Sequence, residues 1–381
     1  MDFHHTEEQK MVRETIREFA LAELAPGAAE RDEKEMFPAE ALKKLGELGF
    51  MGVNVPAELG GAGLDMVSYC IAIEELARVD ASAAIVVSVQ NSLVNYPLEL
   101  FGNEDQKKRF LIPLAQGKLL GAFSLTEPES GSDAGAMKTM AVRDGDHYIL
   151  NGSKNFITSG GNCDVMIVFA VTAPGKGSKG TSAFLLEKGT PGFNVGKHER
   201  KLGIRGSDTV SISLEDCRVR AANMLGTEGM GFKIALTALN SGRIGVASQA
   251  LGIAQACLDE SVKYSLERKQ FGKTISEFQM IRFKVARMAT EIHAARLMLY
   301  YAAGKKDHHE SFIKEAAMAK LYCSECAVKA GLEAIQIHGG YGYIKEYPVE
   351  RYLRDSKITT IYEGTNEVMH LVIADQIYGK Q

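Results

Sequence analysis

Residues 120–133 have the sequence LGAFSLTEPESGSD, and the character of the chain changes within them. The apolar run at the start is typical of a strand, and the second half is a loop rich in Gly and Ser. Before this stretch, from the capping-box signature Thr6–Gln9 to about residue 118, apolar side chains follow helical spacing. After it, to about residue 222, the period is two, and Asp144-Gly145-Asp146 is a hairpin-turn signal. The sequence therefore predicts helices first and strands second.

The C-terminal part returns to a helical pattern, in long segments. They cover about 231–266, 275–303, 309–337 and 365–377. Long amphipathic helices with short connections favour a bundle, and no βαβ alternation is found. We therefore expect an α+β multidomain fold. Its parts are an N-terminal α-helical domain (1–118), a central β-barrel or sandwich domain (119–228) and a C-terminal four-helix bundle domain (229–381).

The composition excludes several classes of function. The formal net charge is −4, and no basic stripe of the kind that binds nucleic acid stands out. The apolar runs are far shorter than the ~18 residues of a membrane-spanning helix. The first residues, MDFHHTEEQK, lack the basic and apolar regions of a secretory signal. We therefore expect a cytoplasmic protein, or one resident in a reducing matrix. We expect it to bind a small molecule, and neither nucleic acid nor a membrane.

The cysteine and glycine patterns do not indicate a metal site or a Rossmann fold. The six cysteines are scattered, as free thiols are. Cys323 and Cys326 form a C-x-x-C inside an Ala-rich helical stretch with no second ligand pair, so we predict helix packing. Redox or metal chemistry stays as the alternative. The glycine-rich segments 226–231 and 339–342 lack the glycine order and the strand–turn–helix unit of a dinucleotide site.

Three stretches carry a more specific signal, namely LTEPESGSD (125–133), ERKQFG (267–272) and IYEGTNE (361–367). Together with NGSK (151–154) and IHGGYG (337–342), their order and spacing closely resemble the acyl-CoA dehydrogenase family over essentially the whole chain. Each fragment alone has a plain structural interpretation, such as an N-cap or a helix-end charge. The resemblance therefore rests on the joint pattern.

The resemblance implies FAD bound between the central domain and the C-terminal bundle. It also implies a homo-oligomer, usually a tetramer, in which Arg268, Gln270 and Phe271 reach the FAD of a neighbouring subunit. Many relatives have Trp at the position of Phe156, whereas this chain has no Trp, so its ring packing is expected to differ slightly. The implied flavin contacts are Phe123, Leu125, Thr126, Ser132, Phe156, Thr158, Arg268, Gln270, Phe271, Gln336, Gly339, Gly340, Thr365 and Glu367.

By the same resemblance, Glu363 is the catalytic base. The α-proton of a thioester is weakly acidic, so its removal needs a carboxylate with a pKa raised by burial. The Glu363 N–H and a flavin hydroxyl would hold the thioester oxygen, and the β-hydrogen would leave as hydride to flavin N5. Some relatives carry the base at the position that Gly242 occupies here. Because glycine cannot act as a base, the sequence favours Glu363 as the single base. The implied substrate contacts are Ser132, Arg243, Tyr362, Glu363 and Gly364, with the loop 201–209 on the CoA side.

The implied reaction converts an acyl-CoA to the trans-2-enoyl-CoA and passes electrons to an electron-transfer flavoprotein, as in fatty acid β-oxidation. The motifs most resemble those of short-chain, butyryl-CoA dehydrogenases; branched, medium-chain or alicyclic thioesters are alternatives. Residues 83–87 are apolar where glutaryl-CoA relatives carry Arg, which disfavours a dicarboxylyl substrate. An acyl-CoA oxidase and a non-catalytic CoA-thioester-binding protein are weaker alternatives, because the chain is short for an oxidase and the base is present.

Overall fold

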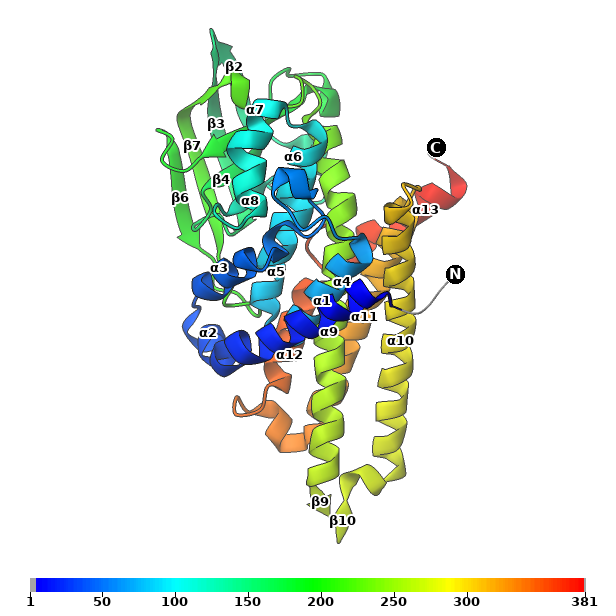
Figure 1. The fold of residues 1–381 in the computed structure, drawn as a ribbon. Coiled ribbons are helices and arrows are strands. Elements are labelled where there is room, and N and C mark those ends of the chain that lie inside the picture. Colours follow the sequence, from blue (N-terminus) through cyan, green and yellow to red (C-terminus); the bar gives the residue numbers. More distant parts are fainter. Residues whose placement is uncertain (1–4, 380–381) are drawn as a thin grey trace.

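The computed structural model describes residues 5–379, with helices toward both ends of the chain and a sheet between them (Figure 1). The sheet lies at one end of an elongated molecule, and the long C-terminal helices run away from it. This arrangement confirms the predicted fold class, while the exact domain boundaries stay a prediction. The N-terminal helices are α1 (Glu7–Phe19), α2 (Ala28–Lys34), α3 (Ala39–Glu47), α4 (Met66–Ala77), α5 (Ala81–Val89), α6 (Tyr96–Phe101), α7 (Glu104–Gln106) and α8 (Ile112–Ala115).

The N-terminal helices connect the sheet to the bundle. Helix α1 begins at the predicted capping box, where the backbone N–H of Gln9 donates to Thr6 Oγ1 at 3.2 Å. Helices α4 and α5 are almost entirely buried and pack against the long helix α9 (Gly231–Glu267). Between α5 and α6 the chain forms a π-helical turn, Gln90–Asn95. The Gln90 amide accepts the Gly121 N–H at 2.8 Å, so this turn fixes the start of the first strand.

The central region is one eight-stranded sheet with the order β6-β7-β3-β2-β4-β5-β8, and β1 pairs in parallel with β4. Strands β2 and β3 form the predicted hairpin around Gly145, whose φ is +61°. The strands are β1 (Gly121–Ser124), β2 (Met140–Asp144), β3 (His147–Thr158), β4 (Val165–Val171), β5 (Thr181–Glu187), β6 (Phe193–His198), β7 (Thr209–Arg220) and β8 (Met224–Leu225).

Both faces of the middle strands are buried. In β4 the odd-numbered positions from Val165 to Phe169 face a core shared with the helices. The even-numbered positions from Met166 to Ala170 face a second core, to which β3, β5 and β7 also contribute. Since strands from both halves of the sheet order meet in that second core, the sheet curls around it. Double burial also explains why residues 165–171 are continuously apolar instead of alternating.

Helix α9 is the central element of the C-terminal bundle and contacts α4, α5, α10 (Gln279–Asp307) and α11 (Ile313–His338). At Gly252 an added Cβ would lie 2.3 Å from the backbone oxygen of Glu74, so glycine there allows α4 to approach closely. The sequence pattern did not predict α12 (Val349–Ile358), which packs on α9 and α11. The remaining elements are the hairpin β9 (Lys269–Gln270) and β10 (Lys273–Thr274), and the helices α10 (Gln279–Asp307), α11 (Ile313–His338), α12 (Val349–Ile358) and α13 (Asn366–Tyr378).

The six cysteines are free and buried. Cys323 and Cys326 lie on α11 with exposed fractions of 0% and 7%, which fits the packing interpretation. Burial raises the pKa of Cys326 to about 12, so that thiol stays protonated near neutral pH. Among residues 5–379, no helix has the length and apolar character needed to cross a membrane.

Candidate active site

The segment between α12 and α13 is a tight turn that carries Glu363. Glu363 has a φ of +53° and Gly364 a φ of +98°, so two successive residues lie outside the usual helical and extended regions. The Asn366 N–H closes the turn by donating to Thr360 O at 3.0 Å. Thr365 then caps α13, because its side chain accepts the Val368 N–H. A non-glycine residue with positive φ costs about 1 kcal/mol or more, and such strain is concentrated at functional sites.

The carboxyl of Glu363 is buried and has no partner. Both of its oxygens are shielded from solvent, and neither makes a hydrogen bond to any residue in the range 5–379. Burial raises the pKa of Glu363 to about 8, and the positive charges of Arg243 and Lys320 oppose the rise. A carboxyl that ionises near neutral pH and accepts no hydrogen bond is suited to proton transfer.

Gly242 of α9 provides the space that this carboxyl occupies. A Cβ at position 242 would lie 1.8 Å from Glu363 Oε2 and 2.9 Å from Leu93 Cδ2. Any side chain at 242 would therefore exclude the Glu363 carboxyl from its observed position. This packing favours one base at this site and places it on the turn.

A buried lysine that sequence reasoning missed holds the same turn. Lys320 of α11 is 0% exposed, and its Nζ donates to Gly364 O at 2.7 Å and to Asn366 Oδ1 at 2.9 Å. Ser324 Oγ, on the next turn of α11, donates to the same Asn366 oxygen at 3.1 Å. Burial lowers the pKa of Lys320 to about 8. The available signal was a lysine at helical spacing within an Ala- and Cys-rich apolar stripe.

Arg243 and Tyr362 lie on either side of the base. The Arg243 guanidinium donates to Asn240 Oδ1 at 2.7 Å, while its Nε is buried and unpartnered within the described chain. Burial lowers the pKa of Arg243, and the charge of Glu363 opposes that change. The Tyr362 hydroxyl donates to Gln249 Oε1 and so fastens the turn to α9. The structure thus brings together the predicted substrate contacts except Ser132, which lies in the exposed loop after β1.

A second group of predicted residues surrounds the end of β1. The Asn155 N–H donates to Thr126 O at 2.9 Å and joins the loop after β1 to β3. Phe156 is 63% exposed and has a φ of +58°, and Thr158 nearby is half-buried. An exposed ring beside half-buried hydroxyls fits a flat aromatic ligand such as a flavin. The group consists of Phe123, Leu125, Thr126, Ser132, Phe156 and Thr158.

A buried ion pair fixes the loop of this group. Lys154 is 0% exposed and donates to Glu127 Oε1 at 2.8 Å and to Leu125 O at 3.1 Å. The same Glu127 oxygen accepts the Thr139 N–H at 3.0 Å. Although burial acts to raise it, the charge and hydrogen bond of Lys154 hold the pKa of Glu127 below its usual value. The polypeptide that would face the flavin is therefore anchored from inside the sheet.

A further set of predicted flavin contacts lies at the β9–β10 hairpin and at the end of α11. Phe271, at the tip of the β9–β10 hairpin, is 92% exposed with a φ of +52°. The Arg268 guanidinium lies 5.4 Å from the centroid of the Tyr341 ring, and a Cβ at Gly339 or Gly340 would meet no atom within 4 Å. A guanidinium beside open backbone fits a phosphate-bearing ligand. The members of this distal group are Arg268, Gln270, Phe271, Gln336, Gly339 and Gly340, while Thr365 and Glu367 lie at the start of α13.

The two groups are separated within one chain. In Figure 1 the β9–β10 hairpin is at the foot of the molecule and the sheet is at the top. The length of α9, Gly231–Glu267, lies between them. A single copy therefore does not assemble both groups into one site.

The 201–209 loop is attached to both helical regions. The Ile204 N–H donates to the buried carboxyl of Asp355 on α12, and Ile204 has a φ of +43°. The Arg205 guanidinium donates to Asp32 O at 2.9 Å, just before the end of α2. The loop therefore joins the N-terminal helices to α12.

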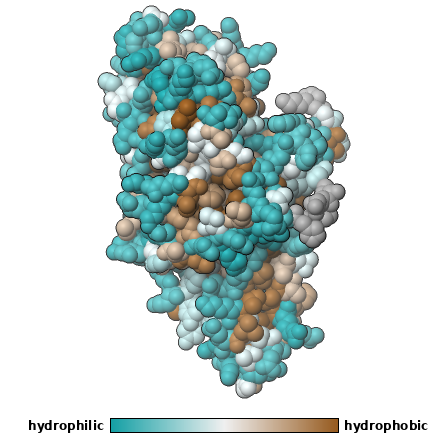
Figure 2. Space-filling view, viewed as in Figure 1, coloured by the Kyte–Doolittle hydropathy of each residue, from teal (hydrophilic) through white to brown (hydrophobic). Residues whose placement is uncertain are grey.

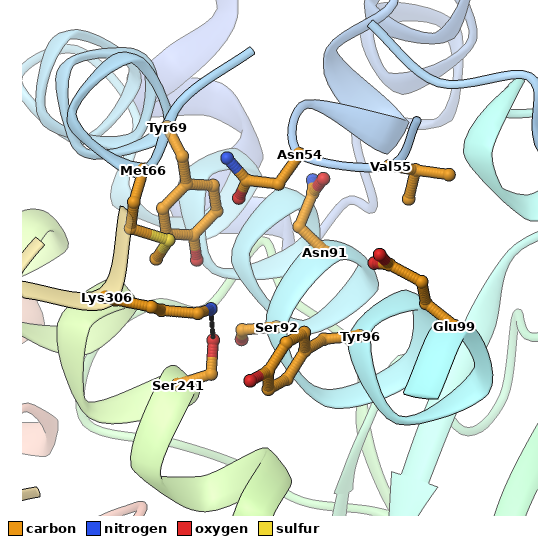
Figure 3. A pocket seen from close by; sticks show the side chains of 10 residues that line it. All are labelled: Asn54, Val55, Met66, Tyr69, Asn91, Ser92, Tyr96, Glu99, Ser241 and Lys306. Atoms are coloured by element: carbon orange, nitrogen blue, oxygen red, sulfur yellow. Dashed lines mark hydrogen bonds between the residues drawn. The ribbon is translucent and has the colours of Figure 1, made fainter. Parts of the chain in front are cut away.

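A small cavity lies where α4, α6, α9 and α10 meet (Figure 3). Its volume of about 10 Å³ is room for about one water molecule. Lys306 of α10 donates to Ser241 Oγ at 2.6 Å, and its Nζ lies 3.9 Å from the centroid of the Tyr96 ring. These contacts fasten α10 to α9 beside Gly242. Among the described residues, no group of three or more His, Cys, Asp or Glu side chains could hold a metal ion.

Comparison with known proteins covers almost the whole chain. The family models for the N-terminal, middle and C-terminal domains of acyl-CoA dehydrogenase match residues 6–118, 122–217 and 229–378. The chain is 49% identical to the short-chain specific acyl-CoA dehydrogenase of Clostridium acetobutylicum, over 99% of this chain and 100% of that protein.

Two solved structures are equally similar. Butyryl-CoA dehydrogenase from Megasphaera elsdenii has a TM-score of 0.98 at 49% identity, with 99% of this chain and 100% of that chain covered. A chain in a structure described as the electron transferring flavoprotein of Acidaminococcus fermentans has a TM-score of 0.99 at 50% identity. That match covers 100% of both chains.

Proposed function

Since this chain belongs to the acyl-CoA dehydrogenase family, we propose that it oxidises a short-chain acyl-CoA to the trans-2-enoyl-CoA with Glu363 as the base. One observation carries the choice of base. The Glu363 carboxyl is buried, has no hydrogen-bond partner among residues 5–379, and has a pKa raised by burial to about 8. Within the described residues, no hydrogen-bond donor occupies the carboxyl oxygen that would accept the proton.

The backbone of the turn supplies the second element of the chemistry. Within the described residues, the N–H of Glu363 donates to no backbone oxygen. An unpaired N–H beside the base is placed to donate to the thioester oxygen, where negative charge develops as the α-proton leaves. This N–H and the carboxyl belong to the same residue, which has a φ of +53°. Glu363 would then retain the α-proton on its carboxyl.

FAD would be held by the group around β1 and by the distal group of another copy. When bound, it supplies a two-electron acceptor for the β-hydride. Phe156 and the half-buried Thr158 would lie against the ring system, while Arg268 and the open backbone at Gly339 and Gly340 would lie against the phosphates. The separation of the two groups supports a homo-oligomer, and we favour the tetramer. In Figure 2 apolar side chains gather on the lower part of the bundle, a surface that a second copy could cover.

The space beside the base favours a short acyl group. Leu93 and Glu363 meet at Gly242, and at Gly245 a Cβ would lie 2.2 Å from Ser88 Oγ and 2.4 Å from the Tyr69 hydroxyl. These side chains close the region where α9 meets α4 and α5. Residues 83–87 of α5 are apolar and buried, so no cation from that stretch can hold a distal carboxylate. Branched, medium-chain and alicyclic thioesters are the alternatives.

The electron acceptor would be an electron-transfer flavoprotein, by analogy with the similar chain from Acidaminococcus fermentans. Electrons would thus leave the enzyme by protein-to-protein transfer instead of reducing dioxygen. A cytoplasmic location completes the proposal, and cell fractionation would test it.

An anaerobic titration with acyl-CoA thioesters of increasing length tests the proposal. Butyryl-CoA or a close neighbour should bleach the flavin absorbance of the wild type, and Glu363→Gln should bind the same thioester without bleaching. Purified protein without flavin, or a variant that is bleached as fast as the wild type, would refute the assignment. A wild type bleached only by longer chains would leave the base intact and overturn the short-chain preference.

A further inference from the structure

The burial of Lys320 is unusual because its Nζ forms no salt bridge to a carboxylate among residues 5–379. It is 0% exposed, and its Nζ bonds to two neutral oxygens, those of Gly364 and Asn366. An ammonium buried without a carboxylate partner is strongly unfavourable, because it loses its hydration. A methionine would fill the same space on the apolar stripe of α11 without that cost. The charge and the donor hydrogens of Lys320 therefore need an explanation beyond packing.

Its hydrogen bonds fix the residues on the C-terminal side of the base. Gly364 O is the first carbonyl after Glu363, and its position depends on the φ of +98° at Gly364. The Asn366 side-chain oxygen accepts hydrogen bonds from Lys320 and Ser324, while the backbone N–H of Asn366 closes the turn. Helix α11 thus anchors the turn on one side, and Tyr362 anchors it to α9 on the other.

The charges around the base come from several packed elements. Arg243 on α9 and Lys320 on α11 both favour the ionised form of Glu363, against the effect of burial. Tyr69 on α4 is neutral, since burial raises its pKa far above the neutral range. Lys320 itself also senses Arg243, Glu367 and Glu325, with burial lowering its pKa to about 8. The ammonium of Lys320 and the carboxyl of Glu363 therefore influence each other's protonation.

From this geometry we propose that Lys320 is a positioning residue for the reaction: its ammonium anchors the turn that presents Glu363, and its positive charge favours ionisation of the Glu363 carboxyl. This inference rests on the proposed function of Glu363. It makes α11 a part of the proton-transfer apparatus, although no side chain of α11 is assigned to touch the substrate.

Three substitutions separate the two effects. Lys320→Met removes both charge and donors, Lys320→Gln keeps a donor without the charge, and Lys320→Arg keeps both. Lys329→Met is the matched control, because Lys329 lies on the same helix, is exposed, and pairs with Glu291 on α10. Nine residues separate it from Lys320, about 13 Å along the helix. Circular dichroism and flavin content establish that each variant is folded.

The readouts are the pH profile of anaerobic flavin reduction by butyryl-CoA and the infrared band of the protonated Glu363 carboxyl, assigned through Glu363→Gln. We expect Lys320→Met and Lys320→Gln to shift the apparent pKa in both readouts upward by about one unit. The methionine variant should also lose about tenfold in reduction rate at saturating thioester. Lys320→Arg and Lys329→Met should stay close to the wild type.

The two proposals fail in different ways. Unshifted pH profiles in the methionine and glutamine variants would overturn the role of Lys320, even if Glu363→Gln abolishes reduction. Reduction that survives Glu363→Gln would overturn the proposed base instead. If Lys320→Met does not fold, the glutamine and arginine variants decide the matter, because both retain donors to the turn and differ in charge.

Discussion

The contact between α9 and the base predicts a specific defect in Gly242→Ala. The added methyl carbon would lie 1.8 Å from Glu363 Oε2 and 2.8 Å from its Cδ. An ordinary contact needs about 3.4 Å, so the oxygen must move by about 1.5 Å. A misplacement of about 1 Å can lower a rate by about 100-fold. We therefore expect flavin reduction to fall by about 100-fold or more.

Gly242→Ala should lower the rate of flavin reduction much more than it lowers the stability of the fold. An extra methyl in a packed core costs about 1–3 kcal/mol, so the variant should fold and keep its flavin. Stopped-flow measurement of flavin bleaching gives the rate, and urea unfolding gives the stability. Gly252→Ala is the control, because Gly252 lies on α9 like Gly242. Its added Cβ would lie 2.3 Å from Glu74 O on α4 and would not touch Glu363. It should be destabilised and yet bleach at the wild-type rate.

One result would refute this reasoning. A folded Gly242→Ala enzyme that bleaches as fast as the wild type, with the same pH dependence, would mean that the carboxyl does not occupy this space during the reaction.

Three further predictions follow from the same structure. Because the pKa of Glu363 is raised to about 8, the folded state holds this proton more tightly than the unfolded state, so the contribution of this group to stability falls as pH rises toward 8. The melting temperature of Glu363→Gln should therefore increase relative to that of the wild type between about pH 5 and 8. A difference in melting temperature that stays constant over this range would contradict the prediction. Lys154→Met should lower the free energy of unfolding in urea by about 3–5 kcal/mol because it leaves Glu127 buried and unpaired, and adding Glu127→Leu should restore much of that free energy. An unchanged unfolding midpoint in the single variant would disprove the buried pair. Phe271→Ala should alter the unfolding free energy by no more than about 0.5 kcal/mol, since the ring is 92% exposed, but should lower the flavin content of purified protein; full flavin retention would argue against the distal group.

The sequence predicted those elements whose signal is local. The capping box at Thr6 and the hairpin turn at Gly145 depend on a few adjacent residues, and both were confirmed. The long helices of the bundle were also confirmed within a few residues, because their apolar stripes are continuous. The motif around Glu363 indicated a turn before the last helix, and the structure has one there.

Elements with a short or mixed apolar pattern were missed. Helix α12 has only 10 residues, and two of its four buried residues, Asp355 and Ser356, are polar, so its apolar stripe is short. Strand β6 is an exposed edge with no buried alternation. The role of Lys320 depends on its contact with Gly364, 44 residues away in the sequence, which local spacing cannot reveal.

The distance between the β1 group and the distal group has a genetic consequence. If each flavin site takes its base from one chain and its hairpin from another, then each chain contributes residues to two different sites. Subunits with Glu363→Gln and subunits with Phe271→Ala, each defective alone, would then complement each other when co-assembled. When one subunit of each kind meets, one shared site receives both substitutions and the other shared site receives neither. Random pairing would thus restore up to about a quarter of the sites. Neither allele alone reveals this, because the unit of function is the contact between chains.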